Sequence, residues 1–394
     1  MKTKPTTFNL GGIKLIFGTN SCEKLQAELT KRKLKKVLVV TDPGIRASGL
    51  LDIFESVLET PYVIFSDVPA DPPAETIVSA LSVLENEGCD GVIAIGGGSP
   101  MDVAKGVRLL ATNDGTIFEY DNSPTGGREF ENQGLFLACI PTTAGTGSEV
   151  TPYAIITNKK EKRKATIGGT YVSPNVAIVD PSLTLNLPPA ITASTGMDAL
   201  AHAIGAYTSG RVIDSQGDTA ISDTLSYKAI ELIASNLRQA YSCGTILQAR
   251  SNMLMGSVLG AFSSNAGSDA THGLGHALGA VYHVPHGVAC AMVMPYVMEY
   301  NLAASPERFA RIAVAFGEDT TGLSPMEAAY KSVVAVKRLM ADIHIPKLSE
   351  YITNFDDFDE LCKVAAEEKC SKLNSRVITL DVAKELLMKA YDDK

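Results

Sequence analysis

The sequence predicts an α/β N-terminal domain with a parallel, Rossmann-like sheet, followed by an all-α C-terminal domain. Two observations indicate this fold class. Short β-branched runs alternate with amphipathic stretches of helical period in the first half, as in strand–helix–strand units. From Pro188 onward, helical periodicity continues almost without interruption. We therefore place a boundary near Leu185, between a domain of residues 1–185 and one of residues 186–394.

The first half alternates predicted strands with predicted helices. Right-handed crossovers between such strands would place helices on both faces of a parallel sheet. The charged run Lys159–Lys164 is predicted to be a solvated turn. Amphipathic helices are predicted at Cys22–Arg32, Gly49–Glu59 and Ala74–Glu87. The predicted strands are Lys14–Phe17, Lys36–Thr41, Tyr62–Ser66, Gly91–Ile95, Leu135–Ile140, Tyr153–Thr157 and Val176–Val179.

The second half is predicted to be helical. Pro188 and Pro189 can open its first helix, since proline is favoured in a first helical turn. The predicted helices are Ala190–Tyr207, Ser215–Tyr241, Leu247–Phe262, Gly287–Tyr300, Pro306–Ala315, Pro325–Ala341, Phe355–Glu368 and Val382–Tyr391.

Composition excludes several classes of protein. The chain has 394 residues, 45% hydrophobic and 20% charged, which is ordinary for a globular protein. A net charge of −9 disfavours nucleic acid or an anionic membrane as partner. The densest apolar run, Val288–Val297, is too short to span a membrane, and the N-terminal MKTKPTTFNL lacks the apolar core of a secretory signal. Seven cysteines without a CxxC pair do not resemble a disulfide framework, so we expect a reduced, cytoplasmic protein.

Histidine is concentrated in one stretch. Four of the six histidines lie between Asn265 and Cys290, and a fifth, His202, follows Asp198 by four residues. Both Asp198–His202 and His272–His276 are i,i+4 pairs, which share a face on a helix. Either pair alone is better explained as a helix-surface or capping pair. Both pairs together with His286, in segments with almost no other charge, predict a metal site, and spacing alone nominates His272 and His276 as paired ligands. The clustered histidines are His272, His276, His283 and His286.

A glycine-rich turn follows the predicted strand Gly91–Ile95. The segment GGGSPMDVAKG, Gly96–Gly106, would place backbone N–H groups at a helix N-terminus, where they bind a phosphate or pyrophosphate. Its spacing differs from both GxGxxG and the GxxxxGK[ST] phosphate loop. The alternative is a tight turn without a ligand. The preceding strand and the Ser99-Pro100 helix start favour phosphate binding.

Two further features follow predicted strands. The segment PTTAGTGSEVT, Pro141–Thr151, is either a second ligand-binding loop at the carboxyl end of a strand or a run of caps and turns. Asp42 ends the strand segment KVLVVTD. It can accept hydrogen bonds from a ribose 2′-hydroxyl and repel a 2′-phosphate, which favours NAD over NADP. A turn-forming Asp before Pro43 is the ordinary alternative.

These motifs together resemble those of the iron-containing (group III) metal-dependent alcohol dehydrogenases. GGGSPMDVAKG, PTTAGTGSEVT, TGMDALAHAIGAYTS and HGLGHALGAVYHVPHG occur in the family's order over nearly the whole chain. The resemblance implies a dinucleotide-binding α/β domain, an all-helical domain and a divalent metal. It also implies a reversible NAD(H)-linked interconversion of a primary alcohol and its aldehyde. Four protein ligands would fill a tetrahedral zinc, so iron(II) is favoured and zinc(II) is the alternative.

The resemblance assigns roles residue by residue. His276 would be a further active-site histidine that moves a proton, which corrects the pairing that spacing suggests; His283 would have no role. The metal ligands would be Asp198, His202, His272 and His286. The cofactor-binding residues would be Asp42, Gly97, Gly98, Ser99, Asp102, Thr142, Thr143 and Lys164.

The chain departs from the family pattern at two places. Where the family commonly has an aromatic residue and an apolar–glycine pair, this chain has Ser263, Ser268 and Asp269. Where the family has N-P-T near the cofactor, this chain has Asp71-Pro72-Pro73. Hydroxyls lining a cleft would favour a short aldehyde with a second polar group. We expect the chain to act as an aldehyde reductase on such a substrate. The alternative is that Ser268 or Asp269 only caps the helix that carries His272.

Other functions remain as alternatives. A zinc-dependent polyol dehydrogenase of the glycerol type shares the two-domain plan, although the order of Asp198-x-x-x-His202 and VPHG fits alcohol dehydrogenases better. A non-catalytic metal- or nucleotide-binding protein is the other alternative. We expect a small-molecule alcohol or aldehyde as the partner, no nucleic acid or membrane, and a homodimer or higher homo-oligomer.

Overall fold

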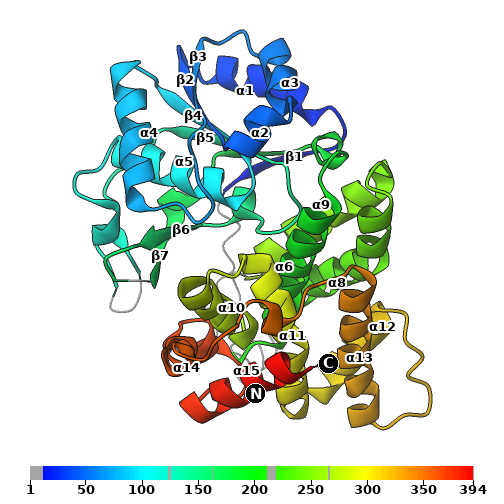
Figure 1. Ribbon diagram of the computed structural model, residues 1–394. Helices are drawn as coiled ribbons and strands as arrows, with labels where there is room; N and C mark the ends of the chain where they lie inside the picture. Colours follow the sequence, from blue (N-terminus) through cyan, green and yellow to red (C-terminus); the bar gives the residue numbers. More distant parts are fainter. Residues whose placement is uncertain (1–11, 123–125, 162, 211–218, 265–266, 394) are drawn as a thin grey trace, which may run out of the picture. The chain divides into compact units, whose positions relative to one another are not determined.

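The computed structural model describes residues 12–122, 126–161, 163–210, 219–264 and 267–393 (Figure 1). These residues form two compact units. One, the α/β unit, contains residues 12–143 and 147–186, and the other, the helical unit, contains residues 144–146 and 187–393.

A six-stranded parallel sheet forms the centre of the α/β unit, in the order β1-β8-β5-β4-β2-β3. Every neighbouring pair of strands is parallel, which confirms the predicted fold class. The strands are β1 (Lys14–Phe17), β2 (Val37–Val40), β3 (Tyr62–Phe65), β4 (Gly91–Gly96), β5 (Phe136–Pro141) and β8 (Val176–Val179).

Helices cover both faces of this sheet. Successive strand residues point to opposite faces, and here both sets of residues are apolar, so each face packs against helices. Leu38 and Val92 are buried in one hydrophobic core, and their neighbours Val39 and Ile93 are buried in another. The first core also contains residues of α4 (Ala74–Asn86) and α5 (Gly98–Leu110), and the second contains residues of α1 (Leu25–Lys31) and α3 (Leu50–Val57) (Figure 1).

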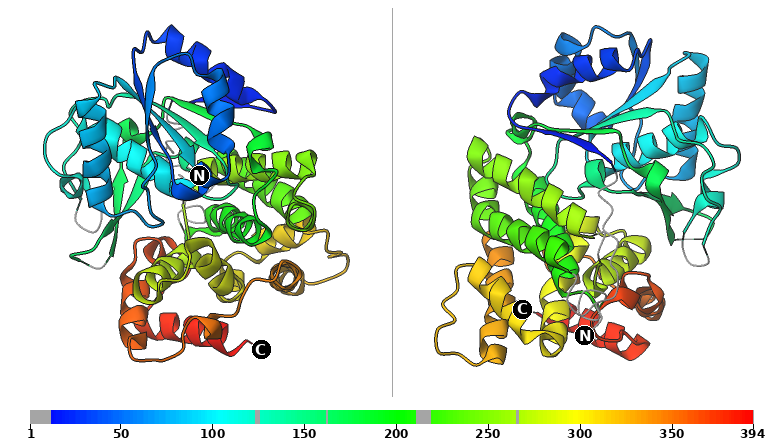
Figure 2. Two further views of the ribbon diagram at one scale, coloured as in Figure 1. Left: turned by 45° about the horizontal axis from the view of Figure 1, so that its top comes forward. Right: turned by 180° about the vertical axis from the view of Figure 1, so that it is seen from behind.

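Two elements of the α/β unit differ from prediction. Strands β6 (Tyr153–Asn158) and β7 (Arg163–Gly168) form an antiparallel ribbon outside the parallel sheet (Figure 2). The predicted solvated turn over Lys159–Lys164 is therefore wrong for Arg163 and Lys164, because β7 buries Ala165 and Ile167 and pairs along its whole length. Residue 162 of that run lies outside the described residues. The short helix α2 (Pro43–Ala47) was not predicted. The 3-10 helices are η1 (Ser21–Lys24), η2 (Ile117–Tyr120), η3 (Ser148–Val150), η4 (Thr170–Val172) and η5 (Pro181–Thr184).

The second unit is helical, as predicted, with helix ends shifted by a few residues. Residues 215–218 of the predicted helix Ser215–Tyr241 lie outside the described part of the chain. No helix within the described ranges is both long and apolar enough to cross a membrane. The helices are α6 (Pro189–Thr208), α8 (Ala220–Ser242), α9 (Leu247–Ser264), α10 (Ala270–Tyr282), α11 (His286–Asn301), α12 (Pro306–Ala315), α13 (Pro325–Asp342), α14 (Phe358–Glu367) and α15 (Leu380–Asp392), with 3-10 helices η6 (Leu302–Ala304), η7 (Leu348–Glu350) and η8 (Ser371–Leu373).

Glycines set the spacing between the helices that carry the histidines. A Cβ at Gly287 of α11 would lie 2.3 Å from the carbonyl oxygen of Ser194 on α6. A Cβ at Gly275 of α10 would lie 2.6 Å from Sγ of Cys290 on α11. Helix α11 therefore approaches both α6 and α10 more closely than any larger residue at these positions would allow.

Candidate active site

Asp198 is the point at which the predicted metal ligands meet. It lies on α6 with His202, whereas His272 lies on α10 and His286 is the first residue of α11. The Nε2 atoms of His202, His272 and His286 lie 3.9, 3.8 and 3.3 Å from Oδ1 of Asp198. Three helices thus bring these four side chains together, and we call them the histidine cluster.

Burial and neighbouring charges together set the protonation of the histidine cluster. Asp198 is 2% exposed and His272 is 3% exposed. Burial alone would raise the pKa of Asp198, but the neighbouring rings of His286 and His202 hold that pKa well below its usual range. Burial lowers the pKa of His202 and of His272. Burial would also lower the pKa of His286, but Cys290 and Asp198 raise that pKa well above its usual value. Because a metal is ligated by an ionised carboxylate and neutral imidazoles, His286 would give up a proton when a metal binds.

Two buried atoms of the cluster lack a hydrogen-bond partner among the described residues. They are Oδ1 of Asp198 and Nε2 of His272. Leaving a buried polar atom unpaired costs about 1–3 kcal/mol, so two such atoms that converge indicate a missing ligand. A carboxylate oxygen and three imidazole nitrogens are suitable donors for a divalent transition metal. The residues present therefore fit the metal that the sequence predicts.

His276 lies beside the cluster and has its own partner. Its ring stacks on that of His286, with centroids 5.1 Å apart. Its Nδ1 lies 3.0 Å from Oε1 of Glu368, the C-cap residue directly after α14. No sequence signal pointed to Glu368, because it is 92 residues from His276 along the chain.

Cys290 is a second neighbour that sequence reasoning missed. Its Sγ lies 3.8 Å from Nε2 and 3.9 Å from Nδ1 of His286. Donor atoms of Asp198, His272, His286 and Cys290 all lie within 4.8 Å of one another. Cys290 follows His286 by four residues, so the spacing rule used for the histidine pairs would have found it.

Two other histidines stand apart from these contacts. His283 is exposed and ends α10 in the left-handed conformation, at φ 55°. His344 is exposed, and its Nδ1 lies 3.1 Å from the hydroxyl of Tyr241.

The predicted cofactor segments lie at one edge of the parallel sheet. From β2 the chain crosses to β3 on one side, whereas from β4 it crosses to β5 on the other. The carboxyl ends of β2 and β4 therefore flank a topological switch point, where open α/β sheets bind ligands. Gly97 precedes α5, and Gly98 and Ser99 begin it, so the N–H groups of its first turn face this edge.

The two predicted loops are in contact. The N–H of Thr142 donates to the carbonyl oxygen of Gly96 at 2.9 Å. A Cβ at Gly97 would lie 3.5 Å from Oγ1 of Thr143. Gly96 has φ +146°, a backbone conformation that favours glycine, so the turn depends on this residue.

Asp42 faces the same turn. Its Oδ1 accepts a hydrogen bond from the N–H of Ile45 at 3.0 Å and caps α2. Its Oδ2 lies 3.0 Å from the Cβ position of Gly96. Asp42 is thus a helix cap whose second carboxylate oxygen points to the glycine-rich turn, and its contact with a ribose stays a prediction.

Asp102 and Lys164 have protein partners in this structure. Asp102 accepts hydrogen bonds from the hydroxyl of Ser148 at 2.9 Å and the N–H of Ile155 at 3.1 Å. These bonds attach α5 to the second loop and to β6. Lys164 on β7 forms an ion pair with Asp71. The direct contacts of Asp102 and Lys164 with a cofactor stay predictions.

The three residues predicted to line a polar cleft have different surroundings. The Ser263 hydroxyl is fully buried and donates to the carbonyl oxygen of Gly260 at 2.7 Å within α9. Asp269 is buried and caps α10 by accepting from the N–H of Thr271 at 2.9 Å. Ser268 is only partly buried, with Oγ 3.5 Å from Nδ1 of His272. Ser263 and Asp269 therefore have structural partners, and Ser268 contacts His272 and Cys370. A contact of any of the three with a substrate stays a prediction. Asn265 and Ala266, between them, lie outside the described residues.

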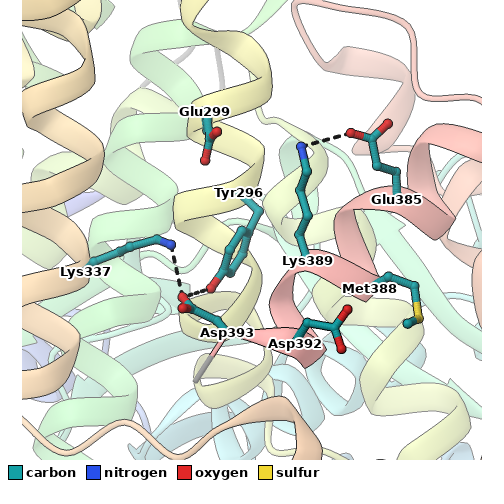
Figure 3. A pocket seen from close by; sticks show the side chains of 8 residues that line it. All are labelled: Tyr296, Glu299, Lys337, Glu385, Met388, Lys389, Asp392 and Asp393. Carbon is teal, nitrogen blue, oxygen red and sulfur yellow. Dashed lines mark hydrogen bonds and ion pairs between the residues drawn. The ribbon is translucent and has the colours of Figure 1, made fainter.

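A separate pocket of about 420 Å³ lies elsewhere in the helical unit (Figure 3). Four of its six charged lining residues form two ion pairs, Lys337 with Asp393 at 3.0 Å and Lys389 with Glu385 at 2.9 Å. The Tyr296 hydroxyl also donates to Asp393. The lining residues include no histidine and no glycine-rich turn, so the pocket is a weaker candidate site than the histidine cluster.

Comparison with known proteins identifies the family. Residues 13–181 match the model described as iron-containing alcohol dehydrogenase, and residues 192–391 match its C-terminal counterpart. The chain belongs to the iron-containing alcohol dehydrogenase family. The predicted resemblance is confirmed, and the protein is an enzyme that interconverts alcohols and aldehydes.

Individual members of the iron-containing alcohol dehydrogenase family match over nearly the whole chain. A 1,3-propanediol dehydrogenase of Klebsiella pneumoniae is 38% identical over 91% of this chain and 92% of its own. An NAD-dependent methanol dehydrogenase of Bacillus methanolicus is 34% identical over 95% of this chain and 97% of its own. The crystal structure of a 1,3-propanediol oxidoreductase superposes with a TM-score of 0.91 at 36% identity, covering 98% of this chain and 100% of that one.

Proposed function

We propose that the protein is an NAD(H)-linked aldehyde reductase and alcohol dehydrogenase with a divalent metal in the histidine cluster. Asp198, His202, His272 and His286 would hold the metal, with iron(II) favoured over zinc(II). The observation that carries this proposal is the convergence of three imidazole nitrogens on Oδ1 of Asp198, with two buried donor atoms that make no hydrogen bond within the described part of the chain. Measuring the metal content of ligand variants tests it, as described in the Discussion.

The α/β unit would bind NAD(H) at the switch point. Backbone N–H groups of Gly97, Gly98 and Ser99 would bind the pyrophosphate at the N-terminus of α5. Thr142 and Thr143, which follow β5, would also contact the cofactor, and Asp42 would contact the adenosine ribose. Asp102 on α5 and Lys164 on β7 would also bind the cofactor. We assign cofactor binding to residues 1–185 and metal binding to residues 186–394.

Each group would have a distinct part in the reaction. A bound metal would supply Lewis-acid stabilisation of negative charge on the substrate oxygen. The nicotinamide would supply or accept the hydride. His276, held beside the cluster by Glu368, would give a proton to the aldehyde oxygen or take it from the alcohol. Burial of Asp198 and His272 excludes water from the innermost part of the site.

We propose a short aldehyde with a second polar group as the substrate. The 1,3-propanediol dehydrogenase among the relatives supports this choice, since its named substrate carries two hydroxyls. Ser268, beside His272, would be the polar residue that selects it. We further propose that the enzyme is cytoplasmic and acts as a homodimer or higher homo-oligomer.

Substrate preference gives a testable prediction. The kcat/KM for a neutral hydroxyaldehyde should exceed that for butanal by at least about tenfold, because a site that hydrogen-bonds a hydroxyl rejects the analogue lacking it. An acidic aldehyde of similar size completes the comparison. Ser268→Ala should reduce this ratio, whereas the control Ser263→Ala should not, since the Ser263 hydroxyl is bonded inside α9. Equal or better efficiency with butanal in the unmodified enzyme would exclude a polar selection.

Cofactor choice gives a second prediction. Asp42→Asn should raise kcat/KM for NADPH by about tenfold or more, since it removes a repulsion of roughly 1–4 kcal/mol with the 2′-phosphate. Asparagine also caps helices well, so α2 should stay intact. Asp42→Gly removes the side chain as well and should also admit NADPH. The gain should shrink at high salt, which screens the repulsion. Equal use of NADPH and NADH by the unmodified enzyme would contradict this role of Asp42.

A further inference from the structure

We propose that Glu368 is a positioning residue that fixes the tautomer and orientation of His276, with the proton on Nδ1 and Nε2 left free to exchange a proton with the substrate. This inference rests on the proton-transfer role proposed above for His276. It adds to the reaction a residue that lies on none of the sequence motifs.

The Glu368 carboxylate is held from two sides. Its Oε1 lies 3.0 Å from Nδ1 of His276, and its Oε2 accepts a hydrogen bond from the N–H of Cys370 at 3.0 Å. The side chains of His276 and Glu368 are 18% and 20% exposed, so both are largely shielded from water. With both oxygens bonded, the carboxylate has one orientation relative to the ring.

The backbone that carries Glu368 is also fixed. Helices α10 and α14 share a hydrophobic core in which Leu274 and Ala277 of α10 lie with Leu361 and Ala365 of α14. The Ser371 hydroxyl closes the turn after α14 by donating to the carbonyl oxygen of Ala365 at 2.6 Å. The position of the carboxylate is therefore set by packing rather than by its bond to His276.

The chemistry of the two partners then determines the tautomer. An ionised carboxylate only accepts hydrogen bonds, so the histidine nitrogen that faces it must carry a proton. Although burial alone would raise the pKa of Glu368, the adjacent His276 and the Cys370 N–H lower that pKa to about 2. In the neutral ring the proton then lies on Nδ1, and Nε2 is an acceptor. The same bond prevents rotation of the ring away from the cluster.

A metal site is the competing explanation for this group. Donor atoms of His276, Glu368 and Cys370 lie within 4.8 Å of one another. Both carboxylate oxygens of Glu368 already have partners, however, and no side-chain nitrogen or oxygen of His276 or Glu368 is buried without a hydrogen-bond partner among the described residues. The contacts therefore favour a positioning role over a second metal.

The experiment compares Glu368→Gln and Glu368→Asp with the unmodified full-length enzyme. Glutamine keeps the size of the side chain, but its amide can donate to the ring nitrogen as well as accept. Aspartate keeps the charge, so Glu368→Asp should be more active than Glu368→Gln. Glu367→Gln is the matched control, because Glu367 is the adjacent exposed carboxylate.

Two readouts are needed. The first is magic-angle-spinning NMR of 15N-histidine-labelled protein loaded with diamagnetic zinc(II), with the His276 signal assigned from its loss in His276→Gln. Unmodified protein should show protonated Nδ1 and unprotonated Nε2, and Glu368→Gln should show a mixture of tautomers. The second is steady-state kinetics with metal analysis. Glu368→Gln should lower kcat by about 10- to 100-fold, with KM for NADH and metal content unchanged.

The outcomes separate this inference from the proposed function. Protonated Nε2 in the unmodified protein, or the unmodified tautomer and kcat in Glu368→Gln, would overturn the role of Glu368. A reduced kcat with an unaltered tautomer in Glu368→Gln would overturn the claim that Glu368 fixes the tautomer. If His276→Ala turns over normally, the proton role of His276 fails, while the NMR result still decides whether Glu368 positions the ring.

Discussion

Replacement of His272 by alanine should abolish stoichiometric metal binding and lower turnover by about 1,000-fold or more. Without the metal, the transition state loses several kcal/mol of stabilisation of the negative charge on the substrate oxygen. Each 1.36 kcal/mol of lost stabilisation lowers the rate by about a factor of ten. His272 is chosen because its Nε2 is buried, has no hydrogen-bond partner among the residues that the structure describes, and lies 3.8 Å from Oδ1 of Asp198. Elemental analysis of the purified protein and kcat with an aldehyde measure the two effects.

Three further variants make the result specific. His286→Ala should behave like His272→Ala, whereas His276→Ala should keep the metal and turn over slowly, since we place His276 outside the ligand set. His283→Asn is a neutral control, because His283 is exposed and asparagine tolerates its left-handed backbone. Circular dichroism should show that all four variants are folded. Stoichiometric metal in His286→Ala would falsify the ligand assignment.

Gly287→Ala is expected to damage both stability and activity through a single methyl group. The added Cβ would lie 2.3 Å from the carbonyl oxygen of Ser194 and 2.9 Å from its carbonyl carbon. These are backbone atoms that cannot rotate away, so α11 must move relative to α6. We expect a loss of about 1–3 kcal/mol in the free energy of unfolding. Since His286 precedes Gly287 and Ser194 lies one turn before Asp198, the shift should also separate His286 from Asp198 and weaken metal binding.

Gly279→Ala is the matched control. Gly279 lies on α10, and its added Cβ would meet only the carbonyl oxygen of Val284 at 3.5 Å, an ordinary contact. Alanine there should leave metal content unchanged and leave stability equal or higher, because alanine favours the helix more than glycine does. Thermal unfolding and metal analysis of both variants make the comparison. Equal melting temperatures for Gly287→Ala and the unmodified protein would show that α11 and α6 are less closely packed than described.

Most of the fold could be predicted because its signals are local. Strand β8 has the predicted bounds Val176–Val179, since a β-branched run between turn residues is a complete signal. Strand β7 could not be predicted, because Arg163 and Lys164 are charged and become strand residues only by pairing with Asn158 and Thr157. Helix α2 was missed because five residues after a strand carry too little periodicity to recognise.

The candidate site also has one part that local sequence predicts and another part that only tertiary packing sets. The sequence by itself determined which donors share a helix face, since Asp198 and His202, like His272 and His276, are separated by one helical turn. It also determined that the glycine-rich turn follows a strand and opens a helix. Only the tertiary structure decided that α6, α10 and α11 meet at Oδ1 of Asp198, and that Glu368 faces His276. Helical spacing is a property of neighbouring residues, whereas these meetings depend on packing between distant segments. The contact of Gly287 with Ser194, for example, carries no periodic signal. The sequence could therefore nominate the ligands, but it could not place Glu368 beside His276.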